Sequence, residues 1–269
     1  MTPYEKQHLI NGLSFELDHC DDPIVYETYT KVLNCIDFDL AKGVATNIGS
    51  AIPDQPGRAN HGKSSKPLSQ VYYNPKKPTI VSRRVAILVA DGFNLDEVKF
   101  VYRALSDAKA MTFIIGPHRG EIRASGYDRD SEKKIKADHH FEGQRSTLFD
   151  ALYIPSGDHI NQLARNGRAV QYVREAFGHC KAIGATGVAI GFLRDTVDLP
   201  GVEFQHPDSS QVKISYGVVT TGEFDIKPGP LRSVHDSESM DFMTEFVNVI
   251  SCHRSYEREL DGLTSRVAF

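Results

Sequence analysis

Residues Arg83–Asp107 read RRVAILVADGFNLDEVKFVYRALSD, and this stretch predicts the fold of most of the chain. Its first part, Val85–Ala90, is an unbroken apolar run with β-branched residues, which is typical of a strand buried on both faces. Asp91 and Gly92 end the run. Beyond them, apolar residues recur at the three- and four-residue spacing of a helix packed on a sheet, at Leu95, Val98, Val101, Tyr102 and Leu105. Strand, tight turn and helix in this order predict the opening unit of a parallel α/β domain.

Later segments repeat this unit to the end of the chain. Further strands are expected at Met111–Ile115, Ala151–Pro155, Ala182–Gly184 and, as one or two strands, Val212–Thr220. Helices are expected at Gly167–Gly178, from Gly187 to near Asp195, and at Asp236–His253, the last largely buried. Glu121–Ala124 and Lys134–Ala137 flank a charged turn and predict a short hairpin. The fold class is therefore α/β, a flavodoxin-like doubly wound parallel sheet with helices on both faces.

The residues before this domain have a different character. Residues 1–49 are expected to be helical, with one apolar stripe at Val25, Tyr29, Val32, Ile36, Leu40 and Val44. This segment has too little apolar surface for a core of its own, so we expect it to pack on another body. Residues 50–82 contain five prolines and no periodicity, which indicates an extended linker. The expected division is thus 1–49, 50–82 and 83–269.

Composition excludes some classes of function. The chain has 269 residues, 40% hydrophobic and 25% charged, with a net charge of −4. This charge gives no reason to expect nucleic acid or an anionic membrane as a partner. No apolar run approaches the roughly 20 residues of a membrane span, and the N-terminus is too polar for a signal peptide. We expect a soluble protein, cytoplasmic or secreted. The cysteines are widely spaced and are expected to be buried free thiols: Cys20, Cys35, Cys180 and Cys252.

In such a sheet, functional sites lie at the carboxyl ends of the strands. Three segments of this chain are expected there: Asp91–Glu97, Ser156–His159 and Gly184–Gly187. The third has the form of a nucleophile elbow, a sharp strand-to-helix turn between small residues. Its apex is expected at Gly184 or Ala185, and neither carries a nucleophile. Thr186 has a hydroxyl, but the sequence offers no base beside it.

These segments resemble the class I glutamine-amidotransferase-like superfamily, particularly its intracellular-protease and deglycase branch. Members show A-I-C-[AH]-G at the elbow and an acidic residue after the first strand. Aligned on Ala182-Ile183, this chain has Gly184 at the cysteine position and Ala185 at the next. The acidic residue corresponds to Asp96 or Glu97. The resemblance therefore implies a vacant nucleophile position and no thiol chemistry.

A second resemblance covers the whole chain. It is carried by LINGLSFELDHCDDPIVYETYTKVLNCIDFDLAKGVA (residues 9–45), KPLSQ (66–70) and RRVAILVADG (83–92). This order is similar to the C-terminal part of large-subunit haem catalases of bacteria and filamentous fungi. The resemblance implies a helical end of the catalase region, a wrapping linker and a flavodoxin-like domain without a known active site. It also implies that haem and peroxide decomposition belong to the parent, and that the partner is the rest of the catalase tetramer.

Several other motifs favour ordinary structural roles. Arg168 and Tyr172 match the Arg-x-x-x-Tyr spacing of a haem tyrosinate, but they fall inside a predicted surface helix. Asp96-Glu97 is expected to complement a helix dipole rather than to act as a catalytic acid. The glycines Gly184, Gly187 and Gly191 lack the context of a phosphate site. Solvated turns are expected at His139-His140 and around Lys133, Lys134 and Lys136. We expect no cofactor or metal in this chain.

Three functions follow as hypotheses. The favoured one is a non-enzymatic domain that stabilises the catalase and acts as a chaperone-like holdase on unfolding client proteins. Cutting away the catalase body would then leave apolar surface that can also drive self-association. The alternatives are a deglycase or hydrolase with a displaced nucleophile, and a regulatory domain that binds a small ligand at the vacant elbow.

Overall fold

The computed structural model describes residues 1–68, 79–128, 132–226 and 241–267. The chain divides into two compact units, residues 1–76 and 77–269, and each is described by itself. The division falls inside the predicted linker 50–82. No helix in the described ranges is long and apolar enough to cross a membrane.

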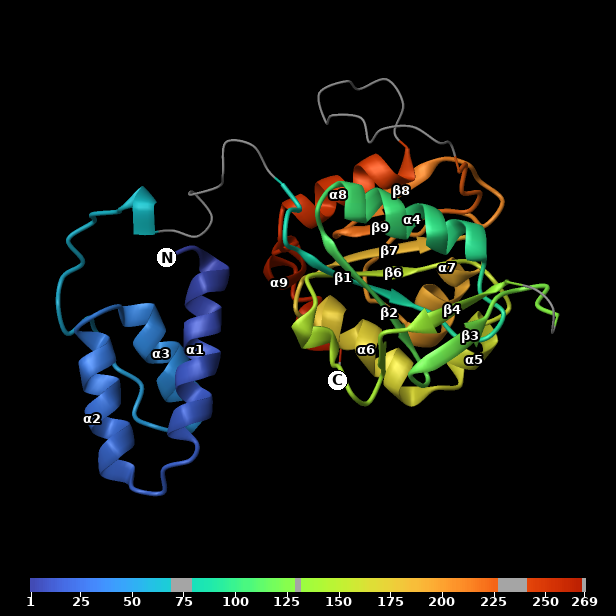
Figure 1. Ribbon diagram of the computed structural model, residues 1–269. Coiled ribbons are helices and arrows are strands. Elements are labelled where there is room, and N and C mark those ends of the chain that lie inside the picture. The colour runs from blue at the N-terminus through green and yellow to red at the C-terminus, as the bar shows by residue number, and fades with distance from the viewer. Residues whose placement is uncertain (69–78, 129–131, 227–240, 268–269) are drawn as a thin grey trace. The chain divides into compact units, whose positions relative to one another are not determined.

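Over its described residues 1–68, the first unit forms three helices, α1 (Pro3–Leu17), α2 (Pro23–Asn34) and α3 (Phe38–Ile48), and a 3-10 turn at Lys66–Leu68 (Figure 1). Each helix begins at a side-chain cap. Thr2 forms a capping box with Glu5, while Asp22 and Asp37 accept backbone N–H groups at the starts of α2 and α3. Because α2 ends at Asn34 and Asp37 caps α3, the expected single stripe is broken into two.

The three helices enclose a small core, which corrects the expectation that this segment has none. Its buried residues come from every helix, namely Ile10, Leu17, Leu33, Leu40, Ala41 and Val44. Within the expected stripe, Leu40 is 1% exposed and Val44 is 0% exposed. Val32 and Ile36, by contrast, are 51% and 66% exposed. The prediction was wrong because it considered the apolar residues of one stripe alone. The core forms because three helices each contribute apolar side chains to a common centre.

The second unit is built on a seven-stranded sheet of order β5-β2-β1-β6-β7-β9-β8. Its strands are β1 (Arg84–Leu88), β2 (Met111–Gly116), β5 (His139–His140), β6 (Ala151–Ile154), β7 (Ala182–Thr186), β8 (Val212–Ser215) and β9 (Val218–Thr221). All neighbouring pairs are parallel except β8 and β9. The five central strands follow the flavodoxin-like order, with the switch in direction between β1 and β6. The predicted α/β fold class is confirmed.

Helices cover both faces of this sheet (Figure 1). On one face lie α4 (Leu95–Asp107) and α8 (Phe242–Ser251), which share a buried core with β1 and β6. The other face is covered by α5 (Ile160–Ala164), α6 (Gly167–Gly178), α7 (Ala189–Gly191) and the π-helix Phe192–Val197. The remaining short elements are Ser146–Leu148, α9 (Glu257–Leu260) and Thr264–Arg266.

Some local predictions differ from the structure. The hairpin β3 (Gly120–Arg123) and β4 (Lys134–Ala137) forms as expected, one residue shifted in its first strand. His139-His140 is a half-buried strand paired with β2 rather than a solvated turn. The last helix begins at Phe242, and the expected start at residues 236–240 lies outside the described ranges.

The core of the first unit yields a matched pair of stability predictions. Leu40→Ala removes a buried side chain and should lower the free energy of unfolding of this unit by about 2–4 kcal/mol. Ile36→Ala removes an exposed one and should change it by less than about 0.5 kcal/mol. Calorimetry with residue-resolved hydrogen exchange would assign the loss to residues 1–48. Equal effects of the two substitutions would contradict an independent core.

Candidate functional site

The carboxyl ends of β1, β6 and β7 bring together the three segments that the sequence placed there. The loop after β1 hydrogen-bonds to the loop after β6, since Asn94 N–H donates to the Ser156 carbonyl at 2.8 Å. The loop after β6 in turn meets the turn after β7, where Val188 N–H donates to Ser156 Oγ at 3.4 Å. The site is therefore assembled from residues far apart in sequence, as the fold class predicts.

Glu97 lies at the centre of this edge. Asn94 caps α4 by accepting the N–H groups of Asp96 and Glu97 at 3.1 and 3.2 Å, which starts the helix so that Glu97 turns inward. Glu97 is 6% exposed, whereas Asp96 is exposed. Of the two acidic positions that the sequence left open, the buried one is thus Glu97.

Four donors surround the Glu97 carboxylate. Oε2 accepts from Thr186 Oγ1 at 2.6 Å, from Ser156 N–H at 2.9 Å and from the Tyr153 hydroxyl at 3.1 Å. Oε1 accepts from Asn94 Nδ2 at 3.1 Å. This arrangement satisfies a buried carboxylate with hydrogen bonds instead of a cation.

Tyr153 is the site residue that the sequence analysis missed. It is fully buried on β6 between α4 and α8, and it stacks at an angle against Phe242 and Phe246. Burial, together with the neighbouring Glu97 carboxylate, raises the pKa of the Tyr153 phenol well above its usual value, so the phenol stays protonated and donates. The only signal in the sequence was a hydroxyl-bearing residue inside the apolar run ALYIP.

Thr186 does have an acceptor beside it, contrary to the expectation from sequence. Glu97 stands 89 residues away along the chain, and its carboxylate is 2.6 Å from the threonine hydroxyl. Thr186 is nevertheless 0% exposed, as is Thr220 on the neighbouring strand. Because a nucleophile must reach a substrate, the Thr186–Glu97 pair acts as a buried structural bond.

The sharp turn is two or three residues later than predicted. Gly184 lies inside β7, paired with Tyr153 and Val219, and a Cβ there would meet the rings of Phe246 and Phe242 at 3.0–3.1 Å. The turn itself is at Gly187, which has a φ of +54° and leads directly into α7. Placing the apex at Gly184 or Ala185 was therefore wrong, because β7 extends to Thr186.

Ser156 fills the space of an elbow side chain. A Cβ built on Gly187 would lie 2.5 Å from Ser156 Oγ and 2.9 Å from Ser156 Cβ. The Ser156 hydroxyl accepts from Val188 N–H, and among the described residues it contacts no imidazole or carboxylate that could act as a base. The elbow residue Gly187 thus carries no nucleophile. The space beside it holds Ser156, which follows β6 and has no base next to it among the described residues.

The crevice at the switch point is closed by the backbone itself. Phe93 forms an antiparallel bridge to Gly157, next to the bond between Asn94 and Ser156. A Cβ on Gly157, whose φ is +135°, would lie 2.4 Å from the Gly92 carbonyl oxygen. Only glycine permits this approach. The space in which doubly wound proteins hold their ligands is here filled by paired loops.

Other predicted residues lie away from this edge. Arg168 pairs with Glu142 at 2.8 Å, while Tyr172 is 3% exposed and packs near Phe141 and Phe149. Burial raises the pKa of the Tyr172 phenol, which disfavours the tyrosinate that a haem ligand requires. Neither residue fits haem binding.

The cysteines are less buried than expected. Only Cys180 is buried; Cys20 is partly exposed, and Cys35 and Cys252 are exposed. Cys180 lies in a left-handed turn just before β7, and burial raises the pKa of its thiol to about 12. It is therefore protonated and unreactive near neutral pH. In the described ranges no three His, Cys, Asp or Glu side chains converge on a possible metal position.

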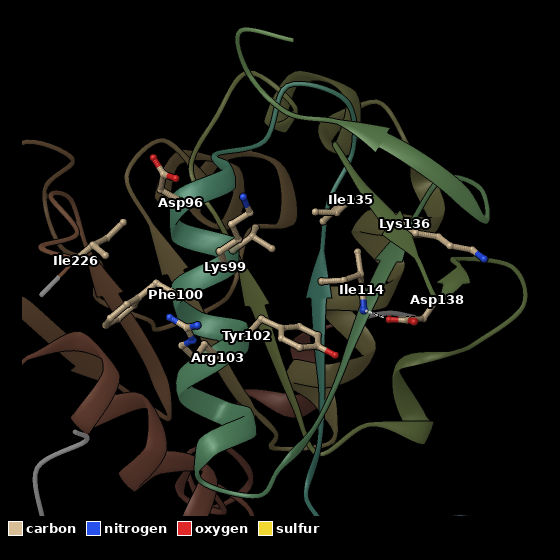
Figure 2. A pocket seen from close by; sticks show the side chains of 11 residues that line it. Asp96, Lys99, Phe100, Tyr102, Arg103, Ile114, Ile135, Lys136, Asp138 and Ile226 are labelled. Carbon is tan, nitrogen blue, oxygen red and sulfur yellow. Dashed lines mark hydrogen bonds between the residues drawn. The ribbon is translucent and has the colours of Figure 1, made fainter. Parts of the chain in front are cut away.

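A groove of about 890 Å³ lies beside α4, and none of its described lining residues belongs to the elbow. Figure 2 shows Phe100, Arg103 and Ile226 on one side of this helix and Tyr102, Ile114 and Ile135 on the other. Lys136 also lines it, whereas Lys134 pairs with Glu121 on the hairpin. The groove follows the outer surface of α4.

The Glu97 network yields a prediction that separates the two acidic positions. Glu97→Gln replaces one accepting oxygen by an NH₂ group among donors, and should lower the free energy of unfolding by about 2–4 kcal/mol. Asp96→Asn changes an exposed residue and should alter it by less than about 0.5 kcal/mol. Denaturant titration of both variants measures the difference. A neutral effect of Glu97→Gln would mean that the network does not hold the edge together.

Comparisons with known proteins identify the family of the chain. Residues 1–48 match the family described as catalase-related immune-responsive, and residues 81–226 match the C-terminal domain found in long catalases. Catalase A of Aspergillus fumigatus is 43% identical over the whole chain, and Catalase-1 of Neurospora crassa is 41% identical over the whole chain. Catalase HPII of Mycobacterium avium is 28% identical over 98% of the chain.

The chain spans 36% of the length of the Aspergillus and Neurospora relatives and 35% of the Mycobacterium one. A solved two-domain protein from Anabaena variabilis, with DJ-1/ThiJ/PfpI-like and ferritin-like domains, is 19% identical. It matches 52% of this chain and 44% of its own with a TM-score of 0.46. Since the domain family matches more than half of the residues, the chain belongs to the C-terminal domains found in long catalases.

Proposed function

We propose that this chain is a non-catalytic C-terminal region of a long catalase, which stabilises the enzyme and acts as a chaperone-like holdase. The observation that carries the first part is the closed carboxyl edge of the sheet. The elbow position Gly187 has no side chain, and Ser156 fills the space that one would take. Beside it, the backbone pairing of Phe93 with Gly157 closes the crevice. A domain without an accessible reacting group acts through its surfaces.

The same geometry disfavours the hydrolase and deglycase alternative. Thr186 has an acceptor but no exposure, and Ser156 is partly exposed but has no base. The thiol of Cys180 is buried and protonated. Nucleophilic catalysis needs exposure, activation and an adjacent base in one residue. None of the described residues at this edge combines them.

Peroxide decomposition and haem are assigned to the remainder of the parent. The relatives are named catalases, and this chain matches about a third of their length. Tyr172 would have to leave the core beside Phe141 and Phe149 to reach an iron, and Arg168 is already paired. Haem therefore has no place among the residues that resemble its ligand motif.

The proposed partner surface lies on the helical unit. Ile24, Val32 and Ile36 are 60%, 51% and 66% exposed on or beside α2, and Tyr29 is 37% exposed. Ile24, Tyr29 and Val32 lie on α2, and Ile36 lies just beyond its end. Exposed apolar side chains gathered on one short segment favour contact with another protein. In the parent this surface would face the rest of the catalase tetramer. When it is free, the same residues would hold apolar segments of unfolding clients.

The assignment of haem is tested directly. Haemin mixed with the chain should give no Soret band of protein-bound haem and no more oxygen from hydrogen peroxide than free haemin gives, because Tyr172 cannot reach an iron. Tyr172→Phe should give the same spectrum as the natural chain. A bound Soret band that Tyr172→Phe abolishes would show that the chain ligates haem through this residue.

The holdase proposal predicts suppression of aggregation at up to twofold molar excess without nucleotide, because the exposed apolar side chains compete for the client's apolar segments. Light scattering of a heated, unrelated enzyme measures it. Val32→Ser with Ile36→Ser should abolish most of the suppression. Glu27→Ser with Lys31→Ser, on the same helix, is the matched control and should retain it.

Two outcomes would contradict the proposed holdase function of α2. Absence of suppression by the natural chain would leave only a structural role. Equal suppression by both double variants would place the activity elsewhere than on α2. Circular dichroism of each variant is needed beside the assay, because a loss caused by unfolding of the helical unit would lower helix content as well.

A further inference from the structure

His159 occupies the point where the two loops of the switch crevice meet. It follows β6 by five residues, is 0% exposed and packs at the start of α5. Its backbone N–H approaches the Gly92 carbonyl at 3.4 Å. The side chain reaches further, to the last residues of the apolar run that contains β1. One residue thus connects the segment after β6 to the segment after β1.

The hydrogen bonds of the imidazole define its protonation state. Ala90 N–H points at Nδ1 from 3.3 Å, so Nδ1 must be an acceptor and carry no proton. Nε2 lies 2.8 Å from the Pro155 carbonyl oxygen, which can only accept, so Nε2 carries the proton. Both backbone partners are satisfied only by the neutral ring in this tautomer.

The charges around His159 do little to favour its protonation. Asp158, on the same loop, favours the charged ring, but burial outweighs it. On the loop after β1, the Asp91 carboxylate accepts from Arg123 N–H at 2.8 Å. On α4, Glu97 is held by its four donors. The helix α5, INQLA, contributes no charged side chain.

We propose that His159 is an acid-sensitive latch, whose protonation removes the acceptor of Ala90 N–H and releases the loop 156–160 from the end of β1. A protonated Nδ1 would set two donors face to face in a buried place. The ring then leaves for water, and the paired loops Gly92–Asn94 and Ser156–His159 separate. This regulation is independent of the proposed holdase surface, which lies in the other unit.

The pH window follows from the two states of the ring. Burial lowers the pKa of His159 from 6.5 to about 4 in the closed form, while a released ring would have its ordinary value. The closed form is therefore fully favoured above pH 6.5, and this preference is lost as the pH falls toward 4. The opening equilibrium should increase on the order of 100-fold between pH 7 and pH 4.

The test is amide hydrogen exchange of the whole chain, because the amide that His159 holds is itself the reporter. The protection of Ala90 N–H, corrected for intrinsic exchange, should fall on the order of 100-fold between pH 7 and pH 4. Val89 N–H is the matched internal control, since it donates to the Ile115 carbonyl across the sheet at 2.9 Å. Its protection should fall much less.

Two variants complete the experiment. His159→Asn supplies a neutral amide oxygen for Ala90 N–H and should remove the pH dependence, whereas His139→Asn on β5 should leave it unchanged. Should His159→Asn misfold, ring ¹⁵N shifts of the natural chain provide the second measurement. They should show protonated Nε2 and bare Nδ1 at pH 7. Equal loss of protection at Ala90 and Val89, or a His159 pKa near 6.5, would overturn the latch.

Discussion

A carboxylate buried at the edge of a sheet must be given hydrogen bonds from every side, and the Glu97 carboxylate imposes this requirement on the α/β unit. Its partners come from the cap of α4, from the interior of β6, from the backbone after β6 and from the end of β7. Ser156 and Thr186 stand 59 and 89 residues beyond it in sequence. Each of these elements must reach its exact place before the charge is compensated. The carboxylate therefore couples the order of the strands to the conformation of the loops that follow them.

This requirement explains how an edge built like an active site is closed by hydrogen bonds within the protein. A catalytic elbow presents a side chain at a strained turn, with open space in front of it and a base behind it. In this chain the strain is relaxed by Gly187, the space is taken by Ser156, and the carboxylate is bound to a threonine that solvent does not reach. The polar groups are those of a site, but both oxygens of the Glu97 carboxylate accept hydrogen bonds from within the protein. A donor that holds a buried carboxylate is not free to bind a substrate. At this edge the donors hold the Glu97 carboxylate.

The predictions that succeeded were those for which local pattern and global packing agree. The run Val85–Ala90 predicted a doubly buried strand, found as Arg84–Leu88, and the spacing from Leu95 to Leu105 predicted the helix that packs on the sheet. The sequence left Asp96 and Glu97 both open, because adjacent residues on a helix differ by a rotation that only packing fixes, and the structure buries Glu97. The elbow was misplaced because Gly184 and Gly187 both follow an apolar run and precede a predicted helix. Only the length of β7, which ends at Thr186, shows which of them forms the turn. The acceptor of Thr186 was missed because it comes from another strand-and-helix unit, a contact that requires the strand order to be known.

In the helical unit the sequence identified the apolar residues but not which of them are buried. Its stripe was identified, yet Leu40 and Val44 turned out to be core while Val32 and Ile36 are surface, because Asp37 starts a new helix and rotates the pattern. This division matters for function. A unit that buried its whole stripe would have no apolar residues left for a partner, and one that buried none would not fold by itself. By closing a core with three helices and leaving part of α2 in water, the unit is stable and still offers an apolar surface. In the α/β unit the polar groups around Glu97 are instead held by hydrogen bonds within the edge of the sheet.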